Sequence, residues 1–139
     1  MIYFDHAATT PVSQPVLEKM RPYLKEKYGN PSSIYKIGRE AKNNLDQARN
    51  EAATFLGSKK PSEIIFTSGA SESNNLAIKG VAFYCDKVLK IKPHLLVSQI
   101  EHHSVLDAAK YLEKYFGYKV DYLPVDREGR IDSDTIRNY

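Results

Sequence analysis

Small hydroxyl residues and a glycine follow a short apolar run within residues 64–75, a pattern typical of an anion-binding turn. A strand that ends in such a turn leaves unpaired amides at the start of the next helix, where the helix dipole is positive. Gly69 lets the backbone approach a ligand closely, and Thr67, Ser68 and Ser71 add hydroxyl donors. The segment is neither a Walker loop nor a dinucleotide fingerprint. It predicts a phosphate-binding cup of a different kind.

A second polar group, Glu101, His102 and His103, follows the next apolar run. Imidazole and carboxylate suit zinc, and the pair Asp5 and His6 allows the same interpretation. Neighbouring side chains in extended backbone point to opposite sides, however, which disfavours a metal site. From the residues alone, a surface or structural histidine at a helix entry is the favoured interpretation of His102. The cup is equally readable as an ordinary strand-to-helix turn.

The predicted secondary structure around these groups changes near residue 60, from helices to alternating strands and helices. Before it, apolar spacing predicts an irregular arm, a helix capped by Ser13 and bent at Pro22, and a longer helix over residues 34–56 that ends at Gly57. We therefore expect two parts, residues 1–60 and 61–139. The first is a helical segment and the second an α/β domain.

The second part alternates strands and helices. We expect strands at residues 64–67, 95–98 and 118–122, and helices at residues 71–89 and from Ser104 to Gly117, with Asp107 completing a capping box. A last helix begins at an Asp132 cap. This βαβαβ order predicts a parallel sheet with right-handed crossovers, whose ligands bind beyond the carboxyl ends of the strands. The cup and His102 would then share one crevice.

Composition narrows the class of protein. The 139 residues are 42% hydrophobic with a net charge of +3, and no basic block predicts nucleic acid or membrane binding. No apolar run approaches the about 20 residues of a membrane span, and no secretory signal pattern is present, so a cytoplasmic protein is expected. Cys85, the one cysteine, shares a helical face with Ile78, Val81 and Val88, which predicts a buried side chain and not a nucleophile.

The last helix is short, and three parallel strands with two crossovers leave a flank uncovered. We therefore expect a truncated piece of a larger α/β protein.

Four ordered motifs resemble those of cysteine desulfurases. They are residues 3–11 (Tyr-Phe-Asp-His-Ala-Ala-Thr-Thr-Pro), residues 28–33 (Tyr-Gly-Asn-Pro-Ser-Ser), residues 66–77 (Phe-Thr-Ser-Gly-Ala-Ser-Glu-Ser-Asn-Asn-Leu-Ala) and Glu101 with His102. The chain resembles the N-terminal portion of these class-V, fold-type-I enzymes, which depend on pyridoxal 5'-phosphate (PLP). The resemblance implies the start of a three-layer PLP-transferase-like domain, preceded by a helical small-domain segment.

The resemblance also implies residue roles. Gly69, Ala70 and Ser71 would bind the cofactor phosphate, and His102 would lie over the pyridine ring, where it can stack and assist proton movement. Asn30 and the arm at residues 5–10 would lie near the active-site mouth. No metal is implied.

The complete enzyme, a sulfurtransferase by this resemblance, would convert L-cysteine to L-alanine and an enzyme-bound persulfide. The sulfur acceptor would be an iron-sulfur scaffold or a tRNA-thiolation protein, and a homodimer is expected. The family's Schiff-base lysine and persulfide cysteine correspond to positions beyond Tyr139, so the chain alone is expected to be inactive. Another class-V PLP enzyme, such as a selenocysteine lyase or an aminotransferase, and a non-catalytic half of a split enzyme or a scaffold are the alternatives.

Overall fold

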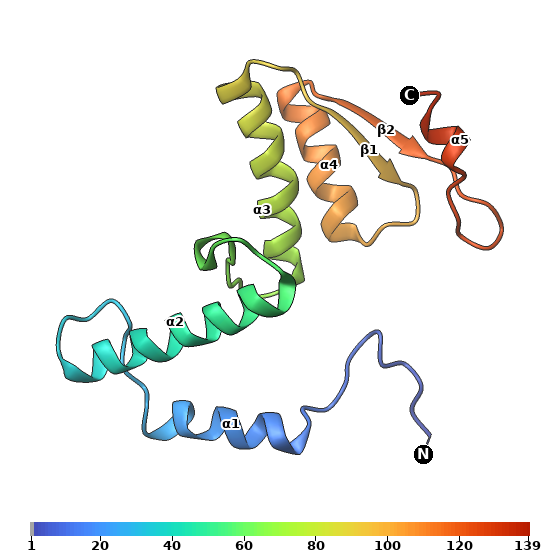
Figure 1. Cartoon of the computed structure of the whole chain (residues 1–139). Helices are drawn as coiled ribbons and strands as arrows, with labels where there is room; N and C mark the ends of the chain where they lie inside the picture. Colours follow the sequence, from blue (N-terminus) through green and yellow to red (C-terminus); the bar gives the residue numbers. More distant parts are fainter. Residues whose placement is uncertain (1) are drawn as a thin grey trace. The chain divides into compact units, whose positions relative to one another are not determined.

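Two compact units make up the chain, one ending at Ile65 and the other spanning Phe66–Tyr139. The computed structural model describes residues 2–139. The elements, labelled where there is room in Figure 1, are α1 (Gln14–Lys25), α2 (Lys36–Leu56), the 3₁₀-helix η1 (Pro61–Glu63), α3 (Ala70–Phe83), the π-helix η2 (Tyr84–Leu89), β1 (His94–Ser98), α4 (His103–Phe116), β2 (Lys119–Leu123) and α5 (Ser133–Ile136). Among the described residues, no helix has the length and apolarity to cross a bilayer.

The first unit holds the expected arm and helices. The arm is an irregular turn closed by the Tyr3 hydroxyl, which donates to the carbonyl of Asp5 over 2.8 Å. Ser13 precedes α1, as predicted, but its side chain makes no capping hydrogen bond, and the helix ends at Lys25. Gly57 ends α2 in the left-handed region with φ of 68°, as the sequence predicts.

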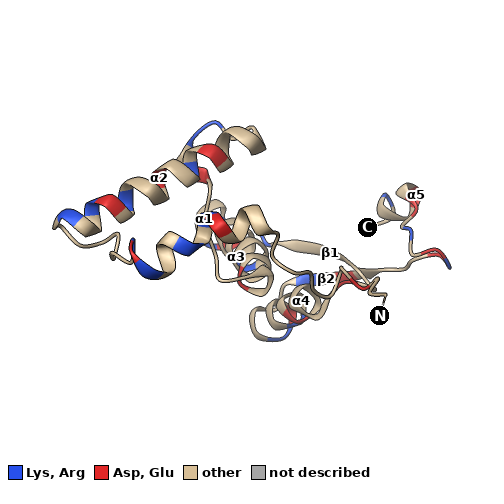
Figure 2. Cartoon of the chain, turned by 90° about the horizontal axis from the view of Figure 1, so that it is seen from below, with Lys and Arg blue, Asp and Glu red and all other residues tan. Residues whose placement is uncertain are grey.

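The loop between α1 and α2 approaches the start of α2 closely. A Cβ added at Gly29 would collide with the carbonyl of Ile37, and one at Gly38 would collide with the carbonyl of Ser33. Asn30 folds this loop back because its side-chain oxygen accepts the amide of Ser32 at 2.9 Å. Acidic and basic residues are interspersed along α2 (Figure 2), which exposes most of its surface.

The second unit is built around a βαβ unit. Strands β1 and β2 pair in parallel, with Leu95 opposite Val120 and Val97 opposite Tyr122, and α4 is the crossover between them. Helix α4 packs on the sheet through Ala109, which contacts Val97 and Val120. Helix α3 packs beside α4, and the two helices run in the same direction in Figure 1. Their N-termini therefore lie at the same end of this unit.

The third expected strand, at residues 64–67, is absent from the described residues. Ile64 is extended, with φ of −89° and ψ of 121°, but the described sheet contains only β1 and β2. A strand is defined by its ladder of hydrogen bonds, so an extended segment without a neighbouring strand is not one. The βαβαβ order is thus realised here as a two-stranded parallel sheet.

Two further expectations are corrected in this unit. The predicted cap of α4, Ser104, lies inside the helix, and the cap is His102. Cys85 is half-buried, not buried, while Val81 and Val88 are 65% and 60% exposed. The change to a π-helix at Tyr84 accounts for part of this difference, because the wider turn rotates the residues after it away from the face that the α-helical period predicts.

Candidate cofactor-binding site

The start of α3 presents unpaired backbone donors. Its first internal hydrogen bond runs from the amide of Ser73 to the carbonyl of Gly69, at 3.1 Å. The amides of Ala70, Ser71 and Glu72 therefore have no acceptor within residues 2–139, and no side chain caps the helix. Three donors at the positive end of a helix dipole are a ready site for an anion.

The hydroxyls around this turn differ from the expected arrangement. The Ser68 amide and hydroxyl both donate to one carboxylate oxygen of Glu72, at 2.7 and 2.6 Å. The Thr67 hydroxyl lies 2.6 Å from that of Ser73. Only Ser71 has a hydroxyl without a hydrogen-bond partner among the described residues of the turn. Ser71 is therefore the hydroxyl that remains available to a ligand.

Glu72 supports the turn rather than the ligand. The hydrogen bonds from the Ser68 hydroxyl and then the Ser68 amide hold the pKa of its carboxyl below the ordinary value. The carboxylate is thus kept ionised and held against Ser68, in the first turn of α3, where a negative charge also stabilises the helix. The carboxylate is used to hold Ser68, in the loop before the helix.

Gly69 is extended, with φ of 166° and ψ of 178°, a conformation open to any residue. A Cβ added there would meet no atom within 4 Å. The backbone of this chain therefore does not require glycine, and the open space above Gly69 leaves room for a ligand at the helix start.

His102 is placed by the start of α4. Its Nδ1 accepts the amide of Ser104 at 3.1 Å, so the imidazole acts as the helix cap. The ring is exposed and meets the ring of His103 edge-on, with 6.2 Å between centroids. Because Nδ1 is used as an acceptor, Nε2 is the ring atom free to contact another molecule.

One hydrogen bond joins the two parts of the site. Asn74, one turn into α3, donates through Nδ2 to the hydroxyl of Ser104 at 2.8 Å, and this hydroxyl lies 2.9 Å from Nδ1 of His102. Both Asn74 and Ser104 are half-buried. The structure thus brings the helix that carries Ala70 and Ser71 together with the histidine predicted to act beside it.

Comparison with known proteins decides the family. The sequence profile described as "Aminotransferase class-V" matches residues 2–139. The chain belongs to the class-V aminotransferase family. Its fold agrees: a solved NifS-like protein superposes with a TM-score of 0.88 at 42% identity over 99% of this chain and 36% of that chain. DndA from Streptomyces lividans superposes with a TM-score of 0.78 at 36% identity, over 99% of this chain and 37% of its own.

Curated relatives of this class-V chain are named as cysteine desulfurases. It is 51% identical to cysteine desulfurase IscS of Dictyoglomus turgidum over 98% of its own length, and 48% identical to the protein of that name from Methanosarcina thermophila over 99%. It covers 33% of each of these relatives. The class-V chain therefore matches about a third of the length of the relatives, at their N-terminal end.

A phosphate cofactor such as PLP fits the residues at the start of α3. The unpaired amides and the Ser71 hydroxyl are donors that a phosphate group can use together, and the space above Gly69 is open. The described part of the class-V chain holds no group of three or more histidine, cysteine or acidic side chains that could bind a metal.

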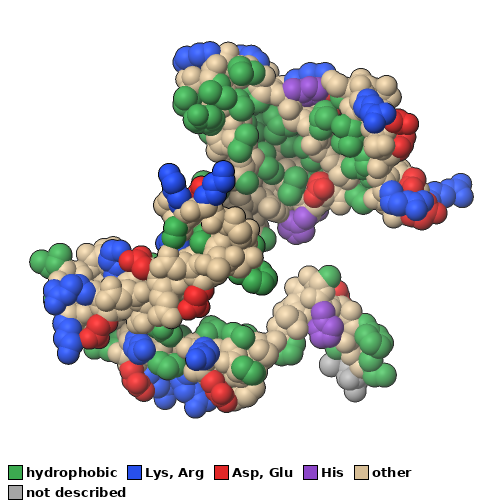
Figure 3. Space-filling model, in the orientation of Figure 1, with side chains coloured by type: hydrophobic (Ala, Val, Ile, Leu, Met, Phe, Trp, Pro, Cys, Tyr) green, Lys and Arg blue, Asp and Glu red, His purple; other side chains and the backbone are tan. Residues whose placement is uncertain are grey.

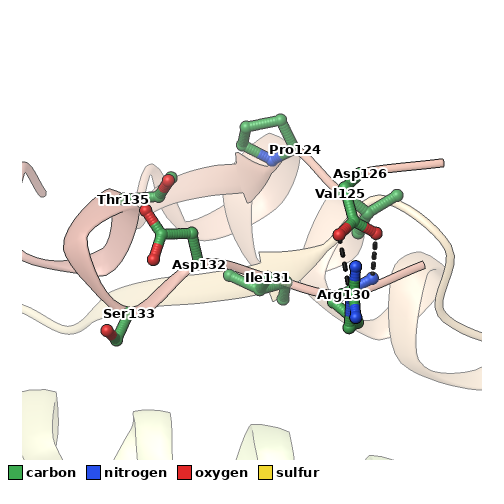
Figure 4. Close-up of a pocket in the computed structure, with 8 residues that line it drawn as sticks. All are labelled: Pro124, Val125, Asp126, Arg130, Ile131, Asp132, Ser133 and Thr135. Carbon is green, nitrogen blue, oxygen red and sulfur yellow. Dashed lines mark hydrogen bonds and ion pairs between the residues drawn. The ribbon is translucent and has the colours of Figure 1, made fainter. Parts of the chain in front are cut away.

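Two cavities of the second unit lie outside this arrangement. One, of about 640 Å³, lies between Pro124 and Thr135, where the Arg130 side chain is paired with Asp126 at 3.0 Å (Figure 4). Its lining includes no candidate site residue. The other, of about 610 Å³, is mostly apolar and is lined by residues of α3 and β1 together with Cys85. Figure 3 shows hydrophobic side chains gathered on this unit.

Glu72, Asn74 and Ser104 take part in this arrangement, although the sequence alone assigned them no role in it. Asn74 lies three residues after Ser71, a spacing that places both on one side of a helix, and this was the available signal. Ser104 was assigned to a helix cap, where serine is common. Its contact with Asn74 joins residues that are 30 positions apart in the sequence, so no local sequence pattern predicts this contact.

Proposed function

We propose that this chain forms the phosphate-binding part of a PLP-dependent cysteine desulfurase, which converts L-cysteine to L-alanine and an enzyme-bound persulfide. The observation that carries the proposal is the joining of the α3 cup to His102 through Asn74 and Ser104, at 2.8 and 2.9 Å. The names of the relatives support the same activity.

Each residue has a defined task in this proposal. The amides of Ala70, Ser71 and Glu72, with the Ser71 hydroxyl, bind the phosphate, and Gly69 leaves space for it. PLP, when bound, supplies an electron sink for bonds at the substrate's α-carbon. His102 holds or moves a proton at Nε2, the nitrogen that its helix-capping contact leaves free.

Cys85 has no task in the reaction. It is half-buried and lines an apolar cavity behind α3 and β1, while a persulfide-forming thiol has to be accessible to a substrate and then to an acceptor. The nucleophile of the complete enzyme is therefore a cysteine outside this chain, as is the lysine that holds the cofactor.

The remaining assignments belong to the complete protein. Residues 1–60 contribute to a small domain and residues 61–139 to the large PLP-binding domain. The enzyme acts in the cytoplasm as a homodimer and passes sulfur to an iron-sulfur scaffold or a tRNA-thiolation protein. The curated names of the relatives support the transfer of sulfur, and the apolar surface exposed on both units supports association with further polypeptide.

A chimera tests the activity. This chain would replace the matching 136 residues of the Dictyoglomus turgidum relative, which supplies the remaining two thirds of its length. The purified chimera should retain PLP, seen by its absorbance near the visible edge, and release sulfide and alanine from L-cysteine with a reductant. The chain by itself should do neither.

Cys85→Ser is the matched control, and the chimera that carries it should keep its activity. A chimera whose circular dichroism and thermal transition match those of the parent relative, but which retains no PLP, would contradict the proposal. Loss of sulfide release in the Cys85→Ser chimera would contradict the place given to Cys85.

A further inference from the structure

We propose that Asn74 and Ser104 are positioning residues that hold His102 in a single tautomer, with its proton on Nε2. The inference deepens the proposed function, because it specifies which atom of His102 faces the bound molecule. It depends on one chain of hydrogen bonds, from Asn74 through the Ser104 hydroxyl to Nδ1 of His102.

The backbone sets the direction of this chain. The amide of Ser104 donates to Nδ1 at 3.1 Å, and an amide can only donate, so Nδ1 carries no proton. In the neutral imidazole the proton must then lie on Nε2. This main-chain contact favours the tautomer with its proton on Nε2, and the side-chain contacts of Ser104 and Asn74 are what make it the single one.

The side chains complete the arrangement. With Nδ1 unprotonated, the Ser104 hydroxyl at 2.9 Å donates its one proton to it. The oxygen of this hydroxyl is then free to accept, and Asn74 donates to it at 2.8 Å. The Ser104 amide and hydroxyl thus share the single lone pair of Nδ1, and the Asn74 proton points along the same series toward His102.

The residues of this hydrogen-bonded series differ in their burial. Asn74 and Ser104 are half-buried between α3 and α4, whereas the His102 ring is exposed. The contact of Asn74 with Ser104 is thus partly shielded from water, whereas Nε2 has no protein partner among the described residues and faces water. Nε2–H is therefore the group that a ligand displacing this water would meet, as a donor and not as a base.

The arrangement also ties the imidazole to the cup. Asn74 lies on α3 one turn after Ser71, so the contact that orients His102 starts from the helix whose N-terminus is proposed to bind phosphate. A change at Asn74 or Ser104 should alter the orientation and tautomer of His102 without removing any group that touches the phosphate.

Nitrogen NMR on the whole chain tests the tautomer without any cofactor. Histidine-selective ¹⁵N labelling and long-range ¹H–¹⁵N correlation, at a pH where the ring is neutral, separate protonated from unprotonated ring nitrogens. The signals of His102, identified by their loss in His102→Gln, should show an unprotonated Nδ1 and a protonated Nε2. Ser104→Ala should add the second tautomer or broaden both signals, and Ser104→Thr should restore the single tautomer.

Ser133→Ala is the matched control, because Ser133 lies in α5 and its side chain makes no hydrogen bond among the described residues. The spectrum of this variant should match that of the parent chain. A protonated Nδ1 in the parent chain, or a Ser104→Ala spectrum identical to the parent's, would overturn the inference.

Kinetics of the chimera supply a second readout. Ser104→Ala should lower kcat about tenfold with the KM for L-cysteine unchanged, since proton transfer is affected and substrate binding is not. An inactive chimera with the expected NMR pattern would reject the proposed function and leave the tautomer established. An active chimera with unchanged kcat in Ser104→Ala would reject the positioning role alone.

Discussion

At the scale of single residues, the site depends on which donors the fold leaves unpaired. Ser68, Thr67 and Ser71 are chemically alike, yet the first two are bonded to Glu72 and Ser73. Only Ser71, at the N-terminus of α3, keeps its hydroxyl for a ligand. The division of tasks is set by the geometry of the turn, not by residue type.

Replacing Ser71 tests this division. Ser71→Asp places a carboxylate at the position of the proposed phosphate, and loss of a hydrogen bond to a charged group costs about 1.5–3 kcal/mol, which corresponds to a PLP dissociation constant raised about tenfold to hundredfold. Equilibrium binding of PLP to the chimera measures it. Ser71→Thr keeps the hydroxyl and should bind within a few fold of the parent. Equal affinity in Ser71→Asp would place the phosphate elsewhere.

At the scale of elements, the π-helix η2 is joined to both strand entries through one carboxylate. Asp86 pairs with Lys87 at 2.6 Å and Lys92 at 3.0 Å, and accepts the Tyr118 hydroxyl at 3.0 Å. Its side chain is only 10% exposed. Lys87, then Lys92 and Tyr118, hold the pKa of Asp86 far below its ordinary value of 3.8.

This shift predicts the acid sensitivity of the second unit. Because the pKa of Asp86 is lowered on folding, its stabilisation is complete above the ordinary value of 3.8 and is lost as the pH falls through the lowered value. Asp86→Asn should lower the melting temperature at neutral pH, and the difference from the parent should narrow below pH 3.8.

Thermal unfolding by circular dichroism across this pH range measures the effect. Asp107→Asn is the control, because Asp107 is 68% exposed and lies 3.7 Å from Lys110, a surface pair of little value. A gap between Asp86→Asn and the parent that stays constant into acid would show that the ion pairs do not stabilise the fold.

Helix ends offer a second comparison at this scale. Gly117 ends α4 with φ of 65°, in the left-handed region, whereas Gly69 precedes α3 in an extended conformation. Gly117→Ala should therefore lower the free energy of unfolding by about 1 kcal/mol. Gly69→Ala should change it by less than about 0.5 kcal/mol, because its Cβ would meet no atom within 4 Å. Urea unfolding compares them, and equal losses would contradict the conformations described.

At the scale of the whole molecule, few hydrophobic side chains are buried and many are exposed. Leu112 is fully buried where α4 meets Ala82 of α3 and Tyr118 before β2. By contrast, Phe4, Ile34 and Phe55 are 89%, 87% and 90% exposed. Surface of this kind is what proteins bury against further polypeptide, and the curated relatives are about three times as long as their matched part.

The small core makes the second unit sensitive to single truncations. Leu112→Ala removes a side chain with 0% exposure and should cost about 3 kcal/mol. This is a large share of the stability of a small domain. Val81→Ala, at a position that is 65% exposed, should cost less than about 0.5 kcal/mol. Urea unfolding of both variants measures the loss in the free energy of unfolding. Comparable losses would show that the core does not centre on Leu112.

Local patterns in the sequence determined much of this protein. The helices, their glycine ends at Gly57 and Gly117, the strands β1 and β2, and the donor-rich turn before Ala70 follow from periodicity and capping, which act over a few residues. The family also follows from the sequence, because its motifs keep their residues and order.

Tertiary structure decided what depends on distant neighbours. The segment at residues 64–67 is not a strand because pairing needs a partner. Cys85 is half-buried in part because a π-helix changes the period, and His102 replaces Ser104 as the cap because the imidazole reaches the amide. The contact of Asn74 with Ser104 exists only because α3 packs against α4. Such contacts form across the fold, so no stretch of sequence contains them.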